Sequence, residues 1–140
     1  MIFLDTSVLV AAAQISHIHY EPSRKLLEQA NRTNSACGLH SLAETYSILS
    51  SLPQSARFPP TAALRMVEQA RQRLQVIALT EKEYIATIEK LASEGLSGGI
   101  VYDALLLQCA RKVNAKRIYS WNARHFKLVA SDLASRIFVP

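Results

Sequence analysis

The sequence predicts an α/β fold in which helices cover both faces of a mostly parallel central sheet. The expected strands are short, continuous apolar runs, which is typical of parallel strands buried on both faces. They alternate with helical segments along the chain, as in folds built from successive strand–helix units. With 140 residues, 49% hydrophobic and 19% charged, the chain is long enough for one domain, residues 1–140, with its own core. The predicted architecture is a three-layer α/β/α sandwich.

The N-terminal segment predicts one strand and two helices. Residues 2–4 are an apolar run that ends at Asp5, too short for anything except a buried strand. A helix is expected from Thr6, with apolar residues at helical spacing in Val8, Leu9, Ala12 and Ile15. After a loop over residues 17–20, Pro22 suits the first turn of a second helix, whose apolar residues are Leu26, Leu27 and Ala30.

The central segment predicts two further strands, at residues 35–39 and 76–79. A helix over residues 41–52 follows the first of these strands and ends at Pro53, because proline cannot continue a helix. After a proline-rich loop, Thr61 is expected to cap another helix that ends near residue 73.

The C-terminal half begins with a capping box, in which Thr80 and Glu83 start a helix. This helix is followed by three glycines that break the chain and give it the freedom to enter the next helix: Gly95, Gly98 and Gly99. That next helix, over residues 101–113, is strongly apolar. Residues 117–120 and 136–139 are the fourth and fifth strands, with a short helix between them.

Polar side chains follow several of these strands. Ligands of parallel α/β sheets bind at the carboxyl ends of the strands. Asp5 comes directly after the first strand, Glu44 lies a few residues after the second, and Ser120 and Asn122 are at the end of the fourth. We therefore expect these residues to converge at one edge of the sheet. Asp103, in the first turn of the apolar helix, is expected to join them because a buried carboxylate needs a partner.

Local capping is an alternative role for each of these side chains. Asp5 begins an Asp-Thr-Ser segment that suits a helix start. Glu44 forms a capping-box pattern with Ser41, and Asn122 suits the start of the last helix. For Asp103 the apolar surroundings favour a functional role over capping, although the helix dipole also relieves part of the cost of burying it.

Taken together, the carboxylates and the amide describe a site for a hard cation. Oxygen ligands without Cys or His suit Mg²⁺ or Mn²⁺. Cys37 and Cys109 lack metal-ligand spacing and are expected to be reduced, buried thiols. His17 and His19 lack the spacing of a zinc site.

The net charge of +5 indicates an anionic partner. Combined with a hard-cation site, it favours phosphodiester chemistry, in which the ion activates water and neutralises charge on the phosphate. Basic side chains would hold the phosphodiester backbone. The candidates for this role are Arg111, Lys112, Lys116, Arg117, Arg124 and Lys127.

The same hydropathy pattern indicates a cytoplasmic protein. No apolar stretch approaches the roughly 20 residues that span a bilayer. Asp5 interrupts the N-terminal apolar run after four residues, so a signal peptide does not fit.

Four short motifs, in order along the chain, resemble a known family. They are Ile-Phe-Leu-Asp-Thr-Ser at residues 2–7, Leu-Ala-Glu at 42–44, Gly-Gly-Ile-Val-Tyr-Asp-Ala-Leu at 98–105 and Ser-Trp-Asn-Ala-Arg-His-Phe at 120–126. Together they resemble the PIN-domain nucleases, and the short length resembles the VapC-type toxins of prokaryotic toxin–antitoxin pairs.

This resemblance implies a PIN-like sandwich and a Mg²⁺- or Mn²⁺-dependent endoribonuclease that a small cognate antitoxin inhibits. Asp5, Glu44 and Asp103 match the acidic triad of the family, and Ser7 matches a hydroxyl often near the metal. Asn122 stands at a fourth position that is commonly acidic, which removes one charge and puts a second metal in doubt. A homodimer is implied by analogy, through the apolar helices between residues 22 and 52.

The sequence therefore favours a toxin-like endoribonuclease without a membrane partner. Asp5, Glu44 and Asp103 would hold the ion directly or through water, and Asn122 and Ser120 would orient that shell. The alternative is a PIN-like module that binds RNA or a protein partner without cutting, and the missing fourth acid motivates it.

Overall fold

A computed structural model describes residues 1–140, and a parallel sheet of five strands lies at its centre. The strands are β1 (Ile2–Leu4), β2 (Ser35–Gly38), β3 (Gln75–Ile77), β4 (Arg117–Tyr119) and β5 (Ile137–Phe138). Their order is β3-β2-β1-β4-β5, and every neighbouring pair is parallel. The predicted parallel sheet is confirmed. Four of the strands are one or two residues shorter than predicted, and β1 has the predicted bounds.

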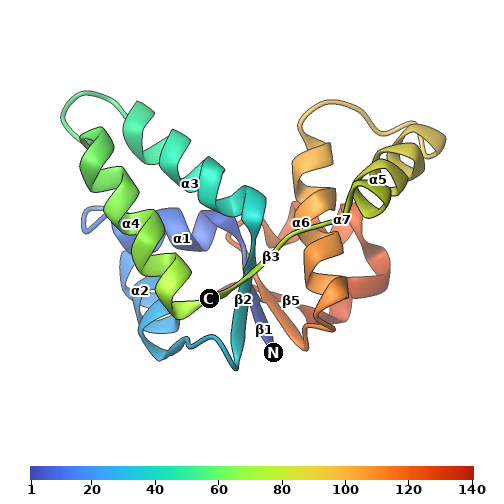
Figure 1. The fold of residues 1–140 in the computed structure, drawn as a ribbon, viewed down its shortest axis with the longest axis horizontal. Helices are drawn as coiled ribbons and strands as arrows, with labels where there is room; N and C mark the ends of the chain where they lie inside the picture. The colour runs from blue at the N-terminus through green and yellow to red at the C-terminus, as the bar shows by residue number, and fades with distance from the viewer.

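Helices cover both faces of this sheet. They are α1 (Thr6–Ala13), α2 (Tyr20–Gln29), α3 (Leu39–Ser51), α4 (Pro60–Arg73), α5 (Glu81–Ser93), α6 (Ile100–Lys112), α7 (Ala123–Val129) and the 3-10 helix η1 (Ser131–Arg136). Figure 1 shows α1 to α4 on one side of the sheet and α5 to α7 on the other. None of these helices has both the length and the hydrophobicity that crossing a membrane requires.

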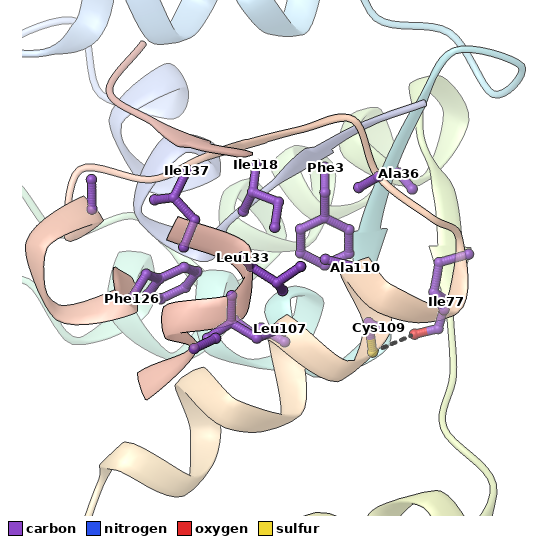
Figure 2. Close-up of a cluster of buried hydrophobic side chains, with 14 residues drawn as sticks. Phe3, Ala36, Ile77, Leu107, Cys109, Ala110, Ile118, Phe126, Leu133 and Ile137 are labelled. Carbon is purple, nitrogen blue, oxygen red and sulfur yellow. Dashed lines mark hydrogen bonds between the residues drawn. The ribbon is translucent and has the colours of Figure 1, made fainter. Parts of the chain in front are cut away.

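Alternate residues of the strands supply two separate cores, because successive side chains point to opposite faces of a sheet. Phe3, Ala36 and Ile118 belong to the larger cluster, which packs against α6 and α7 (Figure 2). Leu4 and Cys37, the next residues along β1 and β2, belong to the cluster under α1 to α4. The short continuous apolar runs thus serve both faces, as the sequence pattern predicts for a sandwich.

Both cysteines are free and buried, as predicted. Burial raises the pKa of the Cys37 thiol to about 12 and that of the Cys109 thiol to about 11. Because the thiolate is the reactive form, both residues act as small apolar core groups at neutral pH.

The predicted boundary between β2 and α3 is wrong by two residues. The strand ends at Gly38 and α3 begins at Leu39, whereas the sequence predicted a helix from Ser41. A Cβ atom at Gly38 would lie 2.6 Å from Leu106 Cδ2 on α6. The early turn into α3 therefore depends on a tertiary contact with α6, which no local pattern reveals.

Other helix ends also differ from the prediction. Pro60 begins α4, so Thr61 lies inside the helix and does not cap it; proline is favoured in the first turn because its missing N–H has no partner there. Helix α1 ends before Ile15, which is 82% exposed, and α2 ends one residue before Ala30. The break before α6 is as predicted, with Gly98 at a φ of +74°.

Replacing Gly38 by alanine is expected to destabilise the protein by about 1–3 kcal/mol, the usual cost of overpacking a core. The added methyl would meet Leu106, which is itself 1% exposed and has no free space to move into. Gly99→Ala is the matched control, because no atom lies within 4 Å of its Cβ position. Urea denaturation should show a loss for Gly38→Ala only; equal stability of the two variants would contradict this contact.

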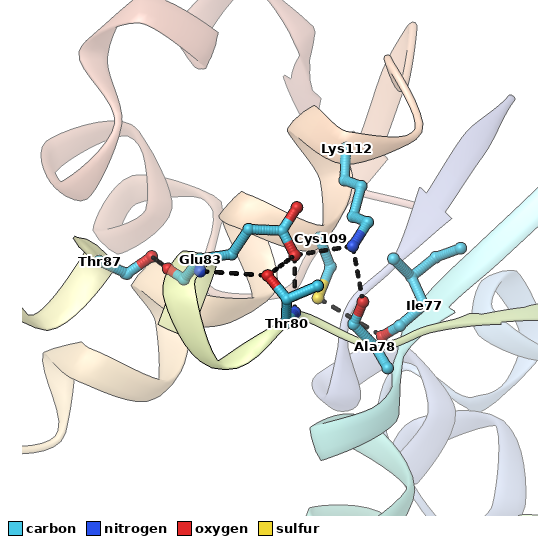
Figure 3. A network of polar contacts seen from close by, with 7 residues as sticks. All are labelled: Ile77, Ala78, Thr80, Glu83, Thr87, Cys109 and Lys112. Atoms are coloured by element: carbon cyan, nitrogen blue, oxygen red, sulfur yellow. Dashed lines mark hydrogen bonds and ion pairs between the residues drawn. The ribbon is translucent and has the colours of Figure 1, made fainter. Parts of the chain in front are cut away.

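The predicted Thr80–Glu83 capping box is confirmed, and it also joins α5 to α6 (Figure 3). Glu83 accepts hydrogen bonds from the Thr80 amide (2.7 Å) and from Lys112 Nζ (2.7 Å). Lys112 also donates to the Ala78 carbonyl, just past the end of β3. Lys112 and the Thr80 amide lower the pKa of Glu83 to about 2. Glu83 is thus ionised at neutral pH and ties the start of α5 to the end of α6.

Candidate active site

Asp5 lies where β1 ends and occupies the position that caps α1. The residue is 3% exposed, and its Oδ2 accepts hydrogen bonds from the Ser7 amide (3.3 Å), the Ser7 hydroxyl (2.6 Å) and the Ser120 hydroxyl (2.8 Å). The capping role is therefore present. It uses only one carboxylate oxygen, because Oδ1 accepts no hydrogen bond from the chain.

Glu44 lies in the second turn of α3, and the expected capping box with Ser41 is wrong. Since α3 begins at Leu39, Ser41 is inside the helix, where its buried hydroxyl has no hydrogen-bond partner. The Glu44 side chain instead reaches across to α1, where Oε2 accepts a 2.6 Å hydrogen bond from the Thr6 hydroxyl. Its other oxygen, Oε1, lies 3.9 Å from His40 Nε2. The Glu44 carboxylate thus faces the start of α1, next to Asp5.

Asp103 lies in the first turn of α6, immediately before a fully buried stretch of that helix. Its side chain is 22% exposed, and Oδ2 is 2.5 Å from His125 Nδ1 on α7. The expectation that a carboxylate here needs a partner is therefore correct. Its protein partner is His125, which the sequence analysis named only as part of the motif at residues 120–126.

The three carboxylates act on one another electrostatically. Burial raises the pKa of Asp5, and the negative charge of Asp103 adds to the increase, while hydrogen bonds from Ser7 and Ser120 oppose it. Burial likewise raises the pKa of Asp103, with a further contribution from Glu44, whereas His125 lowers it. Like charges held close in a poorly solvated site favour protonation or a bound cation. Asp5, Glu44 and Asp103 are therefore close enough for their charges to affect one another.

Two hydroxyl groups link the elements that carry these acids. Ser7 Oγ donates to Asp5 and accepts from the Trp121 amide (3.0 Å), and the fully buried Ser120 Oγ donates to Asp5 and accepts from the Asn122 amide (2.9 Å). These bonds fasten the end of β1 to the end of β4. Asn122 stands at the N-cap position of α7, but its exposed side chain makes no capping hydrogen bond.

The family model of the PIN domain matches residues 2–131 of this chain. The match includes all of the acids above and both hydroxyls. The chain belongs to the PIN-domain family. This PIN domain is 31% identical over 113 residues to the ribonuclease VapC27 of Mycobacterium tuberculosis, which covers 81% of this chain and 79% of that protein. It is 32% identical over 116 residues to ribonuclease VapC40 of the same species, covering 83% of each. These relatives confirm the resemblance to VapC-type nucleases.

Solved structures show the same fold. The crystal structure of Mycobacterium tuberculosis VapC20, a sarcin-ricin loop cleaving toxin, has a TM-score of 0.68 at 18% identity, covering 84% of this chain and 87% of that one. VapBC2 from Rickettsia felis, bound to a DNA fragment from its promoter, has a TM-score of 0.61 at 24% identity and covers 92% and 93% of the two chains. The likeness to both confirms the PIN-like sandwich.

The six basic residues that are candidates for RNA contact form three pairs in this PIN domain, and the first two pairs lie away from the acids. Arg111 and Lys112 are eight and nine residues beyond Asp103 on α6, roughly 12–14 Å along the helix axis, and pair with Asp132 and Glu83. Lys116 and Arg117 lie at the amino end of β4, opposite the acids.

Arg124 and Lys127 remain, and both are exposed on α7, whose first turn follows Asn122. Arg124 lines a shallow surface hollow together with Trp121, Asn122 and His125.

Sequence reasoning missed three residues at the site of this PIN domain. Thr6 orients Glu44, His125 pairs with Asp103, and His40 lies beside Glu44. Only His40 carried a local signal, because residues four apart on a helix share a face. Thr6 and His125 are 38 and 22 residues from their partners, so only the fold brings them together.

Removing the charge of Asp5 is expected to stabilise the metal-free protein increasingly as the pH rises. The pKa of Asp5 in the folded state lies above its ordinary value of 3.8. Between that ordinary value and the raised pKa, the folded state binds more protons than the unfolded state, so the wild type loses stability as the pH rises. Thermal unfolding in EDTA should therefore show that the difference between the unfolding midpoints of Asp5→Asn and the wild type grows with pH over that range. Above the raised pKa, the difference should become constant.

Asp132→Asn is the control of opposite sign. The hydrogen bonds from Arg111 lower the pKa of Asp132, so the wild type should gain stability relative to this variant as the pH rises toward 3.8. A midpoint difference for Asp5→Asn that stays constant or falls with pH would contradict the electrostatic account of the site.

Proposed function

We propose that this PIN domain, acting as one unit over residues 1–140, is a Mg²⁺- or Mn²⁺-dependent endoribonuclease and the toxin of a toxin–antitoxin pair. The observation that carries the proposal is the convergence of Asp5, Glu44 and Asp103, from three different elements, on the carboxyl end of β1. Membership of the PIN-domain family and likeness to VapC ribonucleases support RNA as the substrate.

The donor set fits a hard divalent cation. No three or more His, Cys, Asp and Glu side chains form a group that could hold a metal ion by themselves, so the proposed site relies on fewer direct ligands. Mg²⁺ characteristically uses one or two carboxylates and retains several waters. Asp5, through its free Oδ1, and Asp103 would hold the ion directly, with Glu44 bound directly or through water. The raised pKa values of Asp5 and Asp103 support this assignment, because a cation relieves the repulsion that causes part of the shift.

The chain's own residues prepare this site before an ion binds. Ser7 and Ser120 hold Asp5 Oδ2 and leave Oδ1 without a hydrogen bond from the chain, and Thr6 holds Glu44. Asn122 offers a neutral amide beside the same hydroxyl network, in place of a fourth charge. When bound, the divalent ion would activate water and neutralise charge on the scissile phosphate. Arg124 and Lys127, the candidate cations on α7, would hold the RNA backbone.

Two partners follow from the proposed toxin role. The solved VapBC2 assembly supports a cognate antitoxin as one partner. A second copy of the chain is the other, and we propose the apolar helices between residues 22 and 52 as the dimer surface. We propose the cytoplasm as the location of this activity, which agrees with an RNA substrate.

Metal dependence tests the proposal. Purified protein incubated with total RNA should cleave it in Mg²⁺ or Mn²⁺, stop in excess EDTA and recover when the ion is restored. Sequencing the fragment ends would identify the substrate and the cut site. RNA binding that persists in EDTA, with no cleavage under any metal condition, would instead support the non-cutting RNA-binding module that the uncharged Asn122 suggests.

A further inference from the structure

A stacked aromatic pair bridges α3 and α6 beside the acidic site. The rings of His40 and Tyr102 are 5.0 Å apart between centroids and nearly parallel, at an interplanar angle of 5°. Tyr102 is 46% exposed and the His40 side chain 32% exposed. No step of the proposed hydrolysis uses either ring.

Each ring of the pair is a near neighbour of one carboxylate residue. Tyr102 precedes Asp103 in the first turn of α6, and His40 is one turn before Glu44, with its Nε2 3.9 Å from Glu44 Oε1. A phosphate held at the acids would therefore carry its adjoining nucleoside past these rings.

An apolar cavity of about 260 Å³ is lined by His40, though not by Tyr102, and reaches the end of β3 at Ile77. Beyond His40, the residues that line it include Leu39, Tyr84, Leu79 and Leu105, and no charged side chain does. Leu39 and Tyr84 are large apolar side chains with 53% and 38% exposure, so the walls are open to a ligand. The volume is below the roughly 300–1,000 Å³ typical of sites for drug-sized molecules, which suits a single flat ring system.

We propose that His40, Tyr102 and this cavity form a subsite for one unpaired nucleobase next to the scissile phosphate. The inference rests on the proposed RNA substrate and adds how that substrate is held. Proteins bind single-stranded RNA by splaying bases out and stacking them on Phe, Tyr, Trp or His rings. An aromatic, uncharged pocket immediately beside a phosphate-binding acid cluster matches the two chemically different halves of a nucleotide.

Matched small ligands test the subsite without requiring cleavage. Uridine 5′-monophosphate and adenosine 5′-monophosphate each carry a base, whereas ribose 5-phosphate has the same sugar and phosphate without one. Their dissociation constants in Mg²⁺, measured by NMR titration of the full chain, should show the nucleotides binding about 5- to 100-fold more tightly, as expected for one stacked base.

Substitutions assign that preference to the pair. Tyr102→Ala and His40→Ala should abolish it, Tyr102→Phe should retain it because the ring remains, and ribose 5-phosphate should bind the two Tyr102 variants and the wild type alike. Phe138→Ala is the control: Phe138 is also exposed, at 42%, but lies on β5, at the opposite end of the sheet from the cavity beside β3.

Equal binding of nucleotide and ribose 5-phosphate by the wild type would overturn the subsite, as would no detectable binding of either. So would a base preference that survives both alanine substitutions. Failure of the proposed nuclease function would give a different result from failure of the subsite. Phosphate would then bind independently of Mg²⁺, or RNA cleavage would be absent while the preference for ligands with a base persisted.

Discussion

Replacing Asp103 by asparagine is expected to lower RNA cleavage by at least about 100-fold while the fold is retained. The exchange keeps the size of the side chain and removes one of the charges that would hold the divalent ion, so the loss should exceed the 10- to 100-fold typical of residues that only orient a ligand. Because burial and Glu44 raise the pKa of Asp103, losing the charge should not destabilise the metal-free fold. Initial cleavage rates in saturating Mg²⁺, with thermal unfolding measured in parallel, give the comparison.

Asp132→Asn is the matched control for this prediction. Asp132 is another acid next to α6, but it pairs with Arg111 at the end of the helix far from the site, and its side chain is 60% exposed. A surface ion pair of this kind contributes about 1 kcal/mol or less, so this variant should cleave at the wild-type rate. Full activity in Asp103→Asn would contradict the assignment of the acid cluster.

Replacing Thr6 by valine is expected to weaken metal-dependent cleavage by about 10- to 100-fold, the range found when a residue that orients a metal ligand is removed. Valine has nearly the shape of threonine but lacks the hydroxyl that donates the 2.6 Å bond to Glu44 Oε2. Thr6 is 6% exposed, so water cannot readily replace that donor. Cleavage rates as a function of Mn²⁺ concentration should show a higher half-saturating concentration in the variant.

Thr6→Ser separates the hydroxyl from packing. Serine retains the donor and loses a methyl group, so its half-saturating Mn²⁺ concentration should stay near that of the wild type. If valine left the metal dependence unchanged, or if serine shifted it as strongly as valine, the proposed positioning of Glu44 by Thr6 would be wrong.

Much of the fold could be predicted because its signals are local. The runs at residues 2–4 and 76–79 are apolar throughout, which is what burial on both faces requires. The Thr80–Glu83 box is equally local, since both of its hydrogen bonds join residues three apart. The start of α3 could not be predicted, because it depends on the approach of Gly38 to Leu106 on a helix more than 60 residues later.

The site shows the same division between local and tertiary causes. Asp5 and Asp103 stand out in sequence because a carboxylate beside a buried strand or on an apolar helix needs a partner. Glu44 was ambiguous, since a good capping-box pattern with Ser41 competes with any functional role. Only the position of α3 against α1 resolves it, by placing the Thr6 hydroxyl within reach.

Composition alone does not sort the basic residues. Lys116 and Arg124 are equally plausible phosphate ligands by composition, and the direction of the strands decides between them. Lys116 precedes β4 and Arg124 follows it, so only Arg124 lies on the side of the acids. Net charge predicts an anionic partner but not the face to which that partner binds.

The most direct test of the central claim, that one divalent ion is held jointly by Asp5, Glu44 and Asp103, is anomalous scattering from crystals grown with Mn²⁺. The account predicts a peak at the carboxyl end of β1, in contact with Asp5 and Asp103 and with Glu44 bound directly or through water. The peak should disappear in Asp5→Asn crystals grown in the same way. A protein that cleaves RNA in Mn²⁺ yet shows no peak between these carboxylates, or binds the ion elsewhere, would contradict the account.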